Sequence, residues 1–175
     1  MGQVDYGFKE RAYVLPKDDC FAKLFTDIEQ EDGKLSKIQG NISILHTRFA
    51  EVNRFYSVGK GLSGIPNDHA HPSIDTKNRL ALFHNGNIAN FTELWEGLGV
   101  HKAQVEVSGG FDKPTDSQLI AALLAFEMDE GLSLREALVN VIETKILGTY
   151  RMAALETGNP QSVFFVKNSG EFLIG

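Results

Sequence analysis

The chain has 175 residues, of which 42% are hydrophobic and 23% are charged, and its formal net charge at pH 7 is -6. This length supports one hydrophobic core, so we expect a single domain over residues 1–175. The acidic balance disfavours a nucleic-acid-binding surface, because phosphate backbones are bound by clustered Lys and Arg.

Cysteine content and hydropathy indicate the compartment. Cys20 is the only cysteine, so no disulfide can form within the chain. No apolar run is long enough to cross a bilayer or to resemble a secretion signal. We therefore expect a cytoplasmic protein with no membrane partner.

Four segments in the first half of the chain have the composition of β-strands. They are short runs rich in branched and aromatic residues, at 11–16, 20–25, 41–49 and 79–84. Asn85 and Gly86 follow the last of these and predict a tight turn, because both residues tolerate positive φ. Asn90 stands three residues before Glu93, so a short helix is expected to begin there and to end near Gly97.

Two amphipathic helices and three strands are predicted in the second half. Apolar residues recur at helical spacing over 116–130, and Gly131 ends the pattern. Ser133 and Glu136 form a capping-box pattern before a second apolar stripe over 134–142. Because the connection is very short, the two helices should pack antiparallel. Strands are then expected at 149–155, 162–166 and 171–174.

The order of these elements predicts the fold class. Strands on either side of a helical hairpin favour an α+β fold with antiparallel sheets, since adjacent strands joined by brief turns pair antiparallel. The chain stops at Gly175 directly after a predicted apolar strand. We expect that the full-length protein continues beyond this point.

Four polar clusters lie at the ends of the predicted elements, where functional sites are commonly built. They cover 46–48, 69–72, 84–86 and 114–117. Their histidines, with Asp68 or Asp116, are candidate metal ligands, but no ligand spacing such as HExxH is present. We therefore expect neither a metal nor another cofactor.

Taken in order, these clusters resemble the glutaminase domain of the glucosamine-fructose-6-phosphate aminotransferase family. That family's pattern runs His-Thr-Arg-Trp-Ala, Ala-His-Pro, His-Asn-Gly and Thr-Asp, and the matching segments are 46–50, 70–72, 84–86 and 115–116. Residues 78–94 look especially similar to it, whereas Gly2-Gln3 and 19–21 resemble the related amidophosphoribosyltransferases. The resemblance covers about Asn41 to the C-terminus, and four motifs in the same order make it specific.

The resemblance implies an N-terminal-nucleophile hydrolase-like fold, in which antiparallel sheets form a four-layer αββα sandwich. It also implies a class II glutamine amidotransferase, which hydrolyses L-glutamine to L-glutamate and ammonia. A synthase domain of the full-length protein would then transfer the ammonia to a sugar phosphate, with glucosamine-6-phosphate synthesis as the expected pathway. An uncovered sheet edge would favour a homo-oligomer.

Each matched residue suits this chemistry. Amide hydrolysis passes through an oxyanion, for which the Asn85 side chain and the Gly86 backbone N–H are suitable donors. Arg48 would bind the α-carboxylate of glutamine, and Asp116 its α-ammonium. In the alternative interpretation, Arg48 and Asp116 pair with each other, or Asp116 caps a helix. No histidine is assigned as a general base.

The chain departs from the family pattern at three places. Family members start with a cysteine whose thiolate attacks the amide, whereas this chain starts with Met1, so the family's first strand and helix are expected to be missing. Cys20 lies in an apolar segment and is interpreted as a buried hydrophobe. The family's Trp-Ala-Thr-His is replaced from Phe49 onward, in the pocket that Phe49 and His71 should line. Residues 53–68 form a longer loop, either a lid or an insertion.

Two functions are consistent with this pattern. The first is a glutaminase domain that is truncated at both ends and inactive alone, because it lacks the N-terminal cysteine. The second is a pseudo-glutaminase that acts as a glutamine-binding or regulatory module. The sequence does not separate them.

Overall fold

A computed structural model describes residues 71–172, apart from 106, 108–111 and 157–158. Three predicted strands, at 11–16, 20–25 and 41–49, lie outside the described residues. Cys20, Arg48, Phe49 and the predicted loop over 53–68 lie outside them as well.

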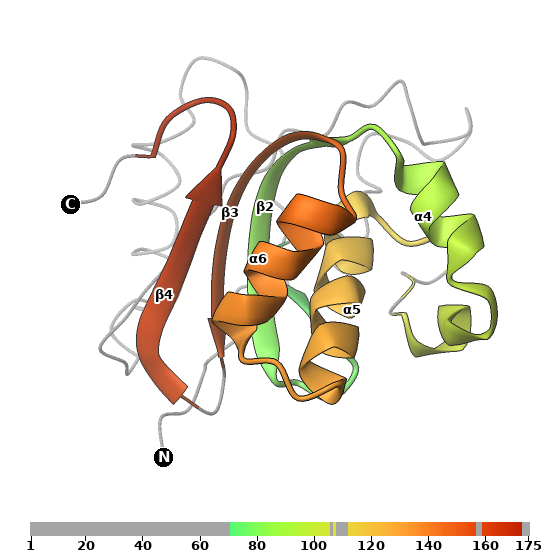
Figure 1. The fold of residues 1–175 in the computed structure, drawn as a ribbon, viewed down its shortest axis with the longest axis horizontal. Coiled ribbons are helices and arrows are strands. Elements are labelled where there is room, and N and C mark those ends of the chain that lie inside the picture. The colour runs from blue at the N-terminus through green and yellow to red at the C-terminus, as the bar shows by residue number, and fades with distance from the viewer. Residues whose placement is uncertain (1–70, 106, 108–111, 157–158, 173–175) are drawn as a thin grey trace, which may run out of the picture.

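The described strands form one antiparallel sheet in the order β1-β2-β3-β4 (Figure 1). Their bounds are Ser73–Ile74 for β1, Leu80–Ile88 for β2, Gly148–Glu156 for β3 and Asn159–Lys167 for β4. The two long central strands pair from Leu80 opposite Glu156 to Ile88 opposite Gly148. The combination of helices with an antiparallel sheet confirms the predicted α+β class.

All described helices lie in the segment that joins β2 to β3. They are α4 (Phe91–Gly97), the 3₁₀ helix η2 (Gly99–Gln104), α5 (Asp116–Asp129) and α6 (Leu134–Thr144). Figure 1 shows α5 and α6 side by side in front of the sheet, and α4 at its margin. The helical hairpin thus covers one face of the sheet.

Local capping signals determine where α5 and α6 begin. Thr115 and Gln118 form a capping box before α5, and Ser133 and Glu136 form one before α6. Asp116 is therefore the first residue of α5 and not its cap, which corrects one alternative from the sequence. Between the helices, Gly131 has a φ of 97°, which a residue with a Cβ rarely adopts.

The predicted turn at Asn85-Gly86 is wrong, because β2 continues through both residues to Ile88. A Cβ at position 86 would lie 2.0 Å from the Thr149 carbonyl oxygen of β3. Glycine therefore allows the two strands to approach closely here, rather than allowing a turn.

Other predictions failed at element ends. Asn90 precedes α4, but its side chain does not cap the helix: it donates to the Lys145 carbonyl at 2.8 Å and accepts from the Leu147 N–H at 2.9 Å. β4 begins at Asn159, before the predicted strand at 162–166, and Glu171 with Phe172 lies in no strand, although a strand was predicted at 171–174. The short elements β1 and η2 were not predicted.

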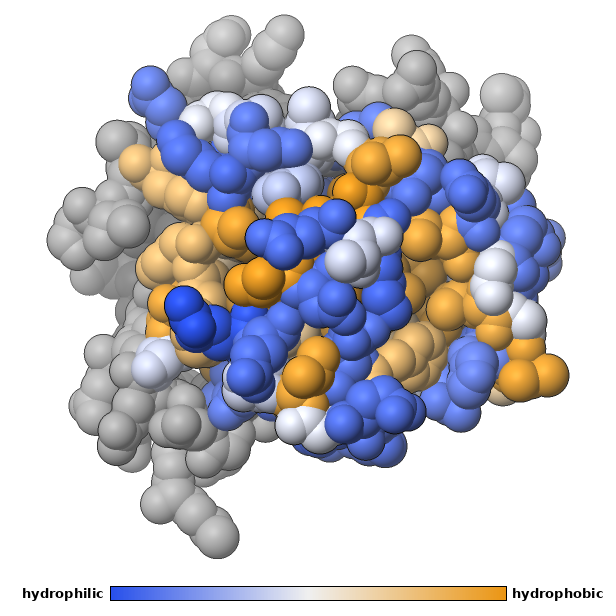
Figure 2. Space-filling model, viewed as in Figure 1, coloured by the Kyte–Doolittle hydropathy of each residue, from blue (hydrophilic) through white to orange (hydrophobic). Residues whose placement is uncertain are grey.

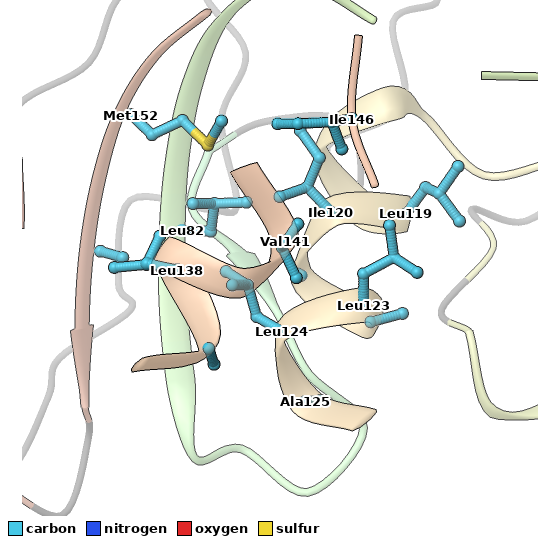
Figure 3. Packing of buried hydrophobic residues seen from close by; sticks show 14 of the residues in the cluster. Leu82, Leu119, Ile120, Leu123, Leu124, Ala125, Leu138, Val141, Ile146 and Met152 are labelled. Atoms are coloured by element: carbon cyan, nitrogen blue, oxygen red, sulfur yellow. The ribbon is translucent and has the colours of Figure 1, made fainter. Parts of the chain in front are cut away.

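The hydrophobic core lies between the helices and the sheet. α5 is buried along its length from Ser117 to Ala125, because it faces both α6 and the sheet. Figure 3 shows core side chains from these layers pointing toward one another, among them Leu82, Met152, Leu119, Ile120, Leu124, Leu138 and Val141. This packing fixes α5, and with it the position of the polar residues at its N-terminus.

Candidate functional site

Three of the four polar clusters meet at Ser117, the second residue of α5. The Ser117 hydroxyl oxygen lies 3.0 Å from His71 Nε2 and 3.1 Å from His84 Nδ1. Its other neighbour is Asp116, whose Oδ1 lies 3.4 Å away and also accepts the Ser117 backbone N–H at 2.9 Å. We call these four residues, His71, His84, Asp116 and Ser117, the polar hub.

The hydrogen-bond chemistry of a serine constrains the polar hub. A hydroxyl donates one hydrogen bond and accepts two, so at least one of the two imidazoles must donate to Ser117. When the hydroxyl donates to Asp116, both imidazoles donate to the hydroxyl oxygen. His84 and Ser117 are only 3% and 4% exposed, so this network fixes the ring of His84 against the start of α5.

Asp116 supplies the carboxylate of the polar hub, and part of it is accessible to solvent. Its side chain is 29% exposed, and its Oδ2 lies 3.8 Å from His84 Nδ1. It lies in the first turn of α5, where the free backbone N–H groups of the helix carry partial positive charge. This arrangement leaves part of the carboxylate able to bind a cationic group.

Asn85 follows His84 but points to the other face of the sheet. Successive side chains of a strand alternate between faces, and His84 faces α5. No hydrogen bond joins Asn85 to Asp116 in the described part of the chain. β1 pairs with β2 only at Ala81 and Leu82, so the β2 edge at 84–86 has no described partner strand.

The structure brings together some of the predicted site residues. His71 and Asp116 share the polar hub, and Asn85 and Gly86 continue from it along β2. Arg48 and Phe49 lie outside the described residues. Ser117 was missed as a functional candidate, although it belongs to the cluster at 114–117, because a serine in the first turn of a helix is common.

A surface hollow of about 530 Å³ lies away from the polar hub. It is lined by Ala89, Asn90, Thr92, Glu93, Glu96 and Leu147, none of which is a predicted site residue. We take the polar hub as the candidate site, because residues from three of the predicted polar clusters lie together there. Within the described ranges, no three His, Cys, Asp or Glu residues are grouped as a metal site requires, and no helix is long and apolar enough to span a membrane.

The chain has relatives of known name. A glutamine–fructose-6-phosphate aminotransferase from Thermococcus kodakarensis is 30% identical over 159 residues, which cover 85% of this chain and 23% of the relative. The enzyme of the same name from Aeropyrum pernix is 30% identical over 151 residues, covering 85% and 21%. That from Staphylococcus epidermidis is 26% identical over 183 aligned positions, covering 99% and 27%. No protein-family model matches the chain.

These relatives confirm the resemblance that the polar clusters predicted. The chain resembles the glutaminase part of the glutamine amidotransferases. More particularly, it is similar to part of the glutamine–fructose-6-phosphate aminotransferases, and it spans about a quarter of the length of these relatives. A solved structure of glutamine phosphoribosylpyrophosphate amidotransferase from B. subtilis matches 64% of this chain and 20% of that chain, with 23% identity and a TM-score of 0.40.

Proposed function

We propose that the chain binds L-glutamine, and its product L-glutamate, at the edge of β2. Asp116 binds the α-ammonium group and Arg48 the α-carboxylate, while Asn85 and Gly86 face the side-chain amide. His71 and Phe49 line the same pocket. The polar hub carries this proposal, because it joins three of the four clusters that resemble the glutaminase pattern.

The role of Asp116 follows from its charge and accessibility. A fixed carboxylate beside a buried hydrogen-bond network binds an ammonium group strongly, because its position is set before the ligand arrives. Ser117 and His84 hold Asp116 from one side, and its exposed part remains available. Arg48 would complete the clamp, since a guanidinium binds a carboxylate through two parallel hydrogen bonds.

Calorimetric titration with L-glutamine tests the clamp. Asp116→Asn keeps the side-chain shape and an acceptor for the Ser117 N–H but removes the charge. We expect it to weaken binding about 10-fold to 100-fold, the value of a charge-assisted hydrogen bond. Glu136→Gln is the matched control, because it removes a carboxylate from the first turn of α6 and should leave binding unchanged. Unchanged affinity in Asp116→Asn contradicts the proposal.

The proposed reaction is hydrolysis of the glutamine amide, with the oxyanion stabilised by Asn85 and the Gly86 N–H. In the whole protein the ammonia would go to a sugar phosphate, as the names of the relatives indicate. An ammonia-release assay on the chain separates two outcomes. Release of ammonia would identify the chain as a glutaminase. Glutamine binding without ammonia release would identify it as a glutamine-binding regulatory module.

The four-layer αββα sandwich is also part of the proposal. What supports it is the second face of the sheet, opposite α5 and α6, which is apolar along much of its length. Its residues are Ala81, Phe83, Ala153, Leu155 and Phe165, and Phe165 stacks edge-on against Phe172 with ring centroids 5.3 Å apart. An apolar sheet face is stable when another layer covers it.

A further inference from the structure

The turn between β1 and β2 is closed by the carboxylate of Asp75. Its Oδ1 accepts the backbone N–H groups of Arg79 at 2.5 Å and of Leu80 at 3.0 Å, and its Oδ2 accepts Arg79 Nε at 3.0 Å. The side chain of Asp75 is only 1% exposed. A buried carboxylate is costly unless donors surround it, so these three hydrogen bonds determine the shape of the turn.

Arg79 joins this turn to the C-terminal end of α5. Its Nη1 lies 2.7 Å from Asp129 Oδ1, and its Nη2 donates to the Ala125 carbonyl oxygen at 3.2 Å. Figure 1 shows the turn before β2 passing beside that end of the helix. The guanidinium thus binds the turn through Nε and the helix through both terminal nitrogens, which the single nitrogen of a lysine cannot reproduce. We call Asp75, Arg79 and Asp129 the turn clamp.

The turn clamp and the polar hub lie at opposite ends of the same helix. Ser117 is the second residue of α5 and Asp129 is the last. A helix rises about 1.5 Å per residue, so the two sites are about 18 Å apart along it. The segment 71–75 connects them, because His71 bonds Ser117 at one end and Asp75 belongs to the turn clamp at the other.

Between these two ends the segment 71–75 has little support of its own. β1 contains two residues and forms two residue pairs with β2 in the described part of the chain. Continuing this register by two residues brings His71 opposite His84, and both rings contact the Ser117 hydroxyl. A pairing this short is marginal alone, so the position of His71 depends on how Asp75 is held.

We propose that the turn clamp positions His71 at the polar hub and thereby sets the affinity for L-glutamine from the far end of α5. The inference rests on the proposed function, in which His71 lines the glutamine pocket. Asp75 and Arg79 are positioning residues that act through His71 and do not touch the ligand. When the turn clamp is weakened, His71 occupies the binding position for a smaller fraction of the time, and the apparent affinity falls by that fraction.

Arg79→Lys tests the turn clamp, because lysine keeps the charge but cannot bond Asp75 and α5 together. We expect the affinity for L-glutamine, measured by calorimetry, to fall about threefold to tenfold, the value of one neutral hydrogen bond. In nuclear magnetic resonance spectra of the unliganded chain, the imidazole ¹⁵N signals of His71 should shift. Those of His84 should move less, because β2 pairs with β3 along its full length.

Asp75→Asn breaks the same link from the other side and should give the same two changes, since an amide nitrogen then meets the Arg79 Nε donor. Lys77→Gln is the charge control. Lys77 is exposed and bonds the same Asp129 oxygen at 2.7 Å, and an exposed ion pair contributes little. Val141→Ala is the stability control, because it removes buried volume from α6. Both controls should leave glutamine affinity and the His71 signals unchanged.

Urea denaturation of every variant separates positioning from a general loss of stability. The inference is overturned if folded Arg79→Lys and Asp75→Asn change glutamine affinity and the His71 signals no more than the two controls do. A loss of stability without a loss of affinity also overturns it. If the unmodified chain binds no glutamine, the proposed function is wrong, and the His71 signals alone then decide whether the turn clamp positions that ring.

Discussion

The packing of β2 against β3 requires a residue without a Cβ at position 86, independently of any role of Gly86 in ligand binding. A Cβ at this position would lie 2.0 Å from Thr149 O and 2.8 Å from Tyr150 Cα, and both are backbone atoms of β3. We expect Gly86→Ala to lower the free energy of unfolding by about 2 to 4 kcal/mol, measured by urea denaturation, because overpacked strands must separate.

Gly97→Ala is the matched control for this prediction. Gly97 is the last residue of α4, and a Cβ there would meet no atom within 4 Å. Alanine should therefore raise stability by about 0.5 to 1 kcal/mol, because it is the better helix former. Equal stability of Gly86→Ala and the unmodified chain would contradict the observed packing of β2 against β3.

At the residue scale, the sequence motifs singled out side chains that the structure brings partly together. His84, Asn85 and Asp116 were found from ordered motifs, and the structure joins His84 to Asp116 through Ser117. The predicted turn at Gly86 was wrong. The Asn-Gly pair is a turn signal in the local sequence, but pairing with β3, more than 60 residues away, keeps the backbone of Gly86 extended. Arg79 was not singled out as a site residue. Its contact with the end of α5, 50 positions along the chain, depends on the tertiary fold, which no local pattern reveals.

At the element scale, α5 and α6 are joined by a polar contact. The Glu127 carboxylate of α5 forms an ion pair with Lys145 after α6 and accepts a hydrogen bond from Asn140 Nδ2 at 2.6 Å. The hydrogen bond from Lys145, supported by Asn140, lowers the pKa of Glu127 below its usual value of 4.5 and outweighs the opposing effect of burial. The charged form of Glu127 therefore stabilises the fold.

The sign of this pH effect can be tested. Because the folded-state pKa is lowered, the contribution of Glu127 is fully present above pH 4.5 and is lost as the pH falls through the folded-state pKa. We expect Glu127→Gln to destabilise the chain at pH 7 and to have a smaller effect at pH 3, measured by urea denaturation at both values.

Lys145→Met tests whether the same contact is responsible. If it is, the double variant should lose less stability than the two single losses added together, which shows a favourable coupling between Glu127 and Lys145. A Glu127→Gln effect of equal size at both pH values would show that the charge is not involved.

Elements with strong local signals were predictable and the others were not. The Ser133 and Glu136 capping box and Gly131 placed the start of α6 and the junction correctly, and the apolar spacing from residue 116 placed the start of α5. The capping box of Thr115 and Gln118 was not predicted. β1 has two residues and η2 has six, too few for a periodic pattern to develop. Asn90 carried a capping signal, but its side chain connects the end of β2 to the segment before β3, a contact that exists only in the folded chain.

At the scale of the whole molecule, the described residues form a helical layer on an antiparallel sheet. Figure 2 views the molecule from the helical side, where hydrophilic side chains predominate with apolar ones between them. This is the pattern of an outer layer exposed to water. The opposite face of the sheet is apolar over much of its length and ends in a polar row of Asn85, Arg151 and Lys167. The sequence predicted an antiparallel sheet with a helical hairpin, but it did not predict that His84 and Asn85 lie on opposite faces of that sheet.

The central claim is that the segments around His71, Asn85 and Asp116 form one amino-acid-binding site. Nuclear magnetic resonance of the ¹⁵N-labelled chain, titrated with L-glutamine, tests it directly. The account predicts that backbone amide shifts change together at positions 71, 84–86 and 115–118, with little change at Gly131 or around Glu93 and Glu96. Changes confined to the hollow beside α4, or shifts at only one of the three segments, would contradict it.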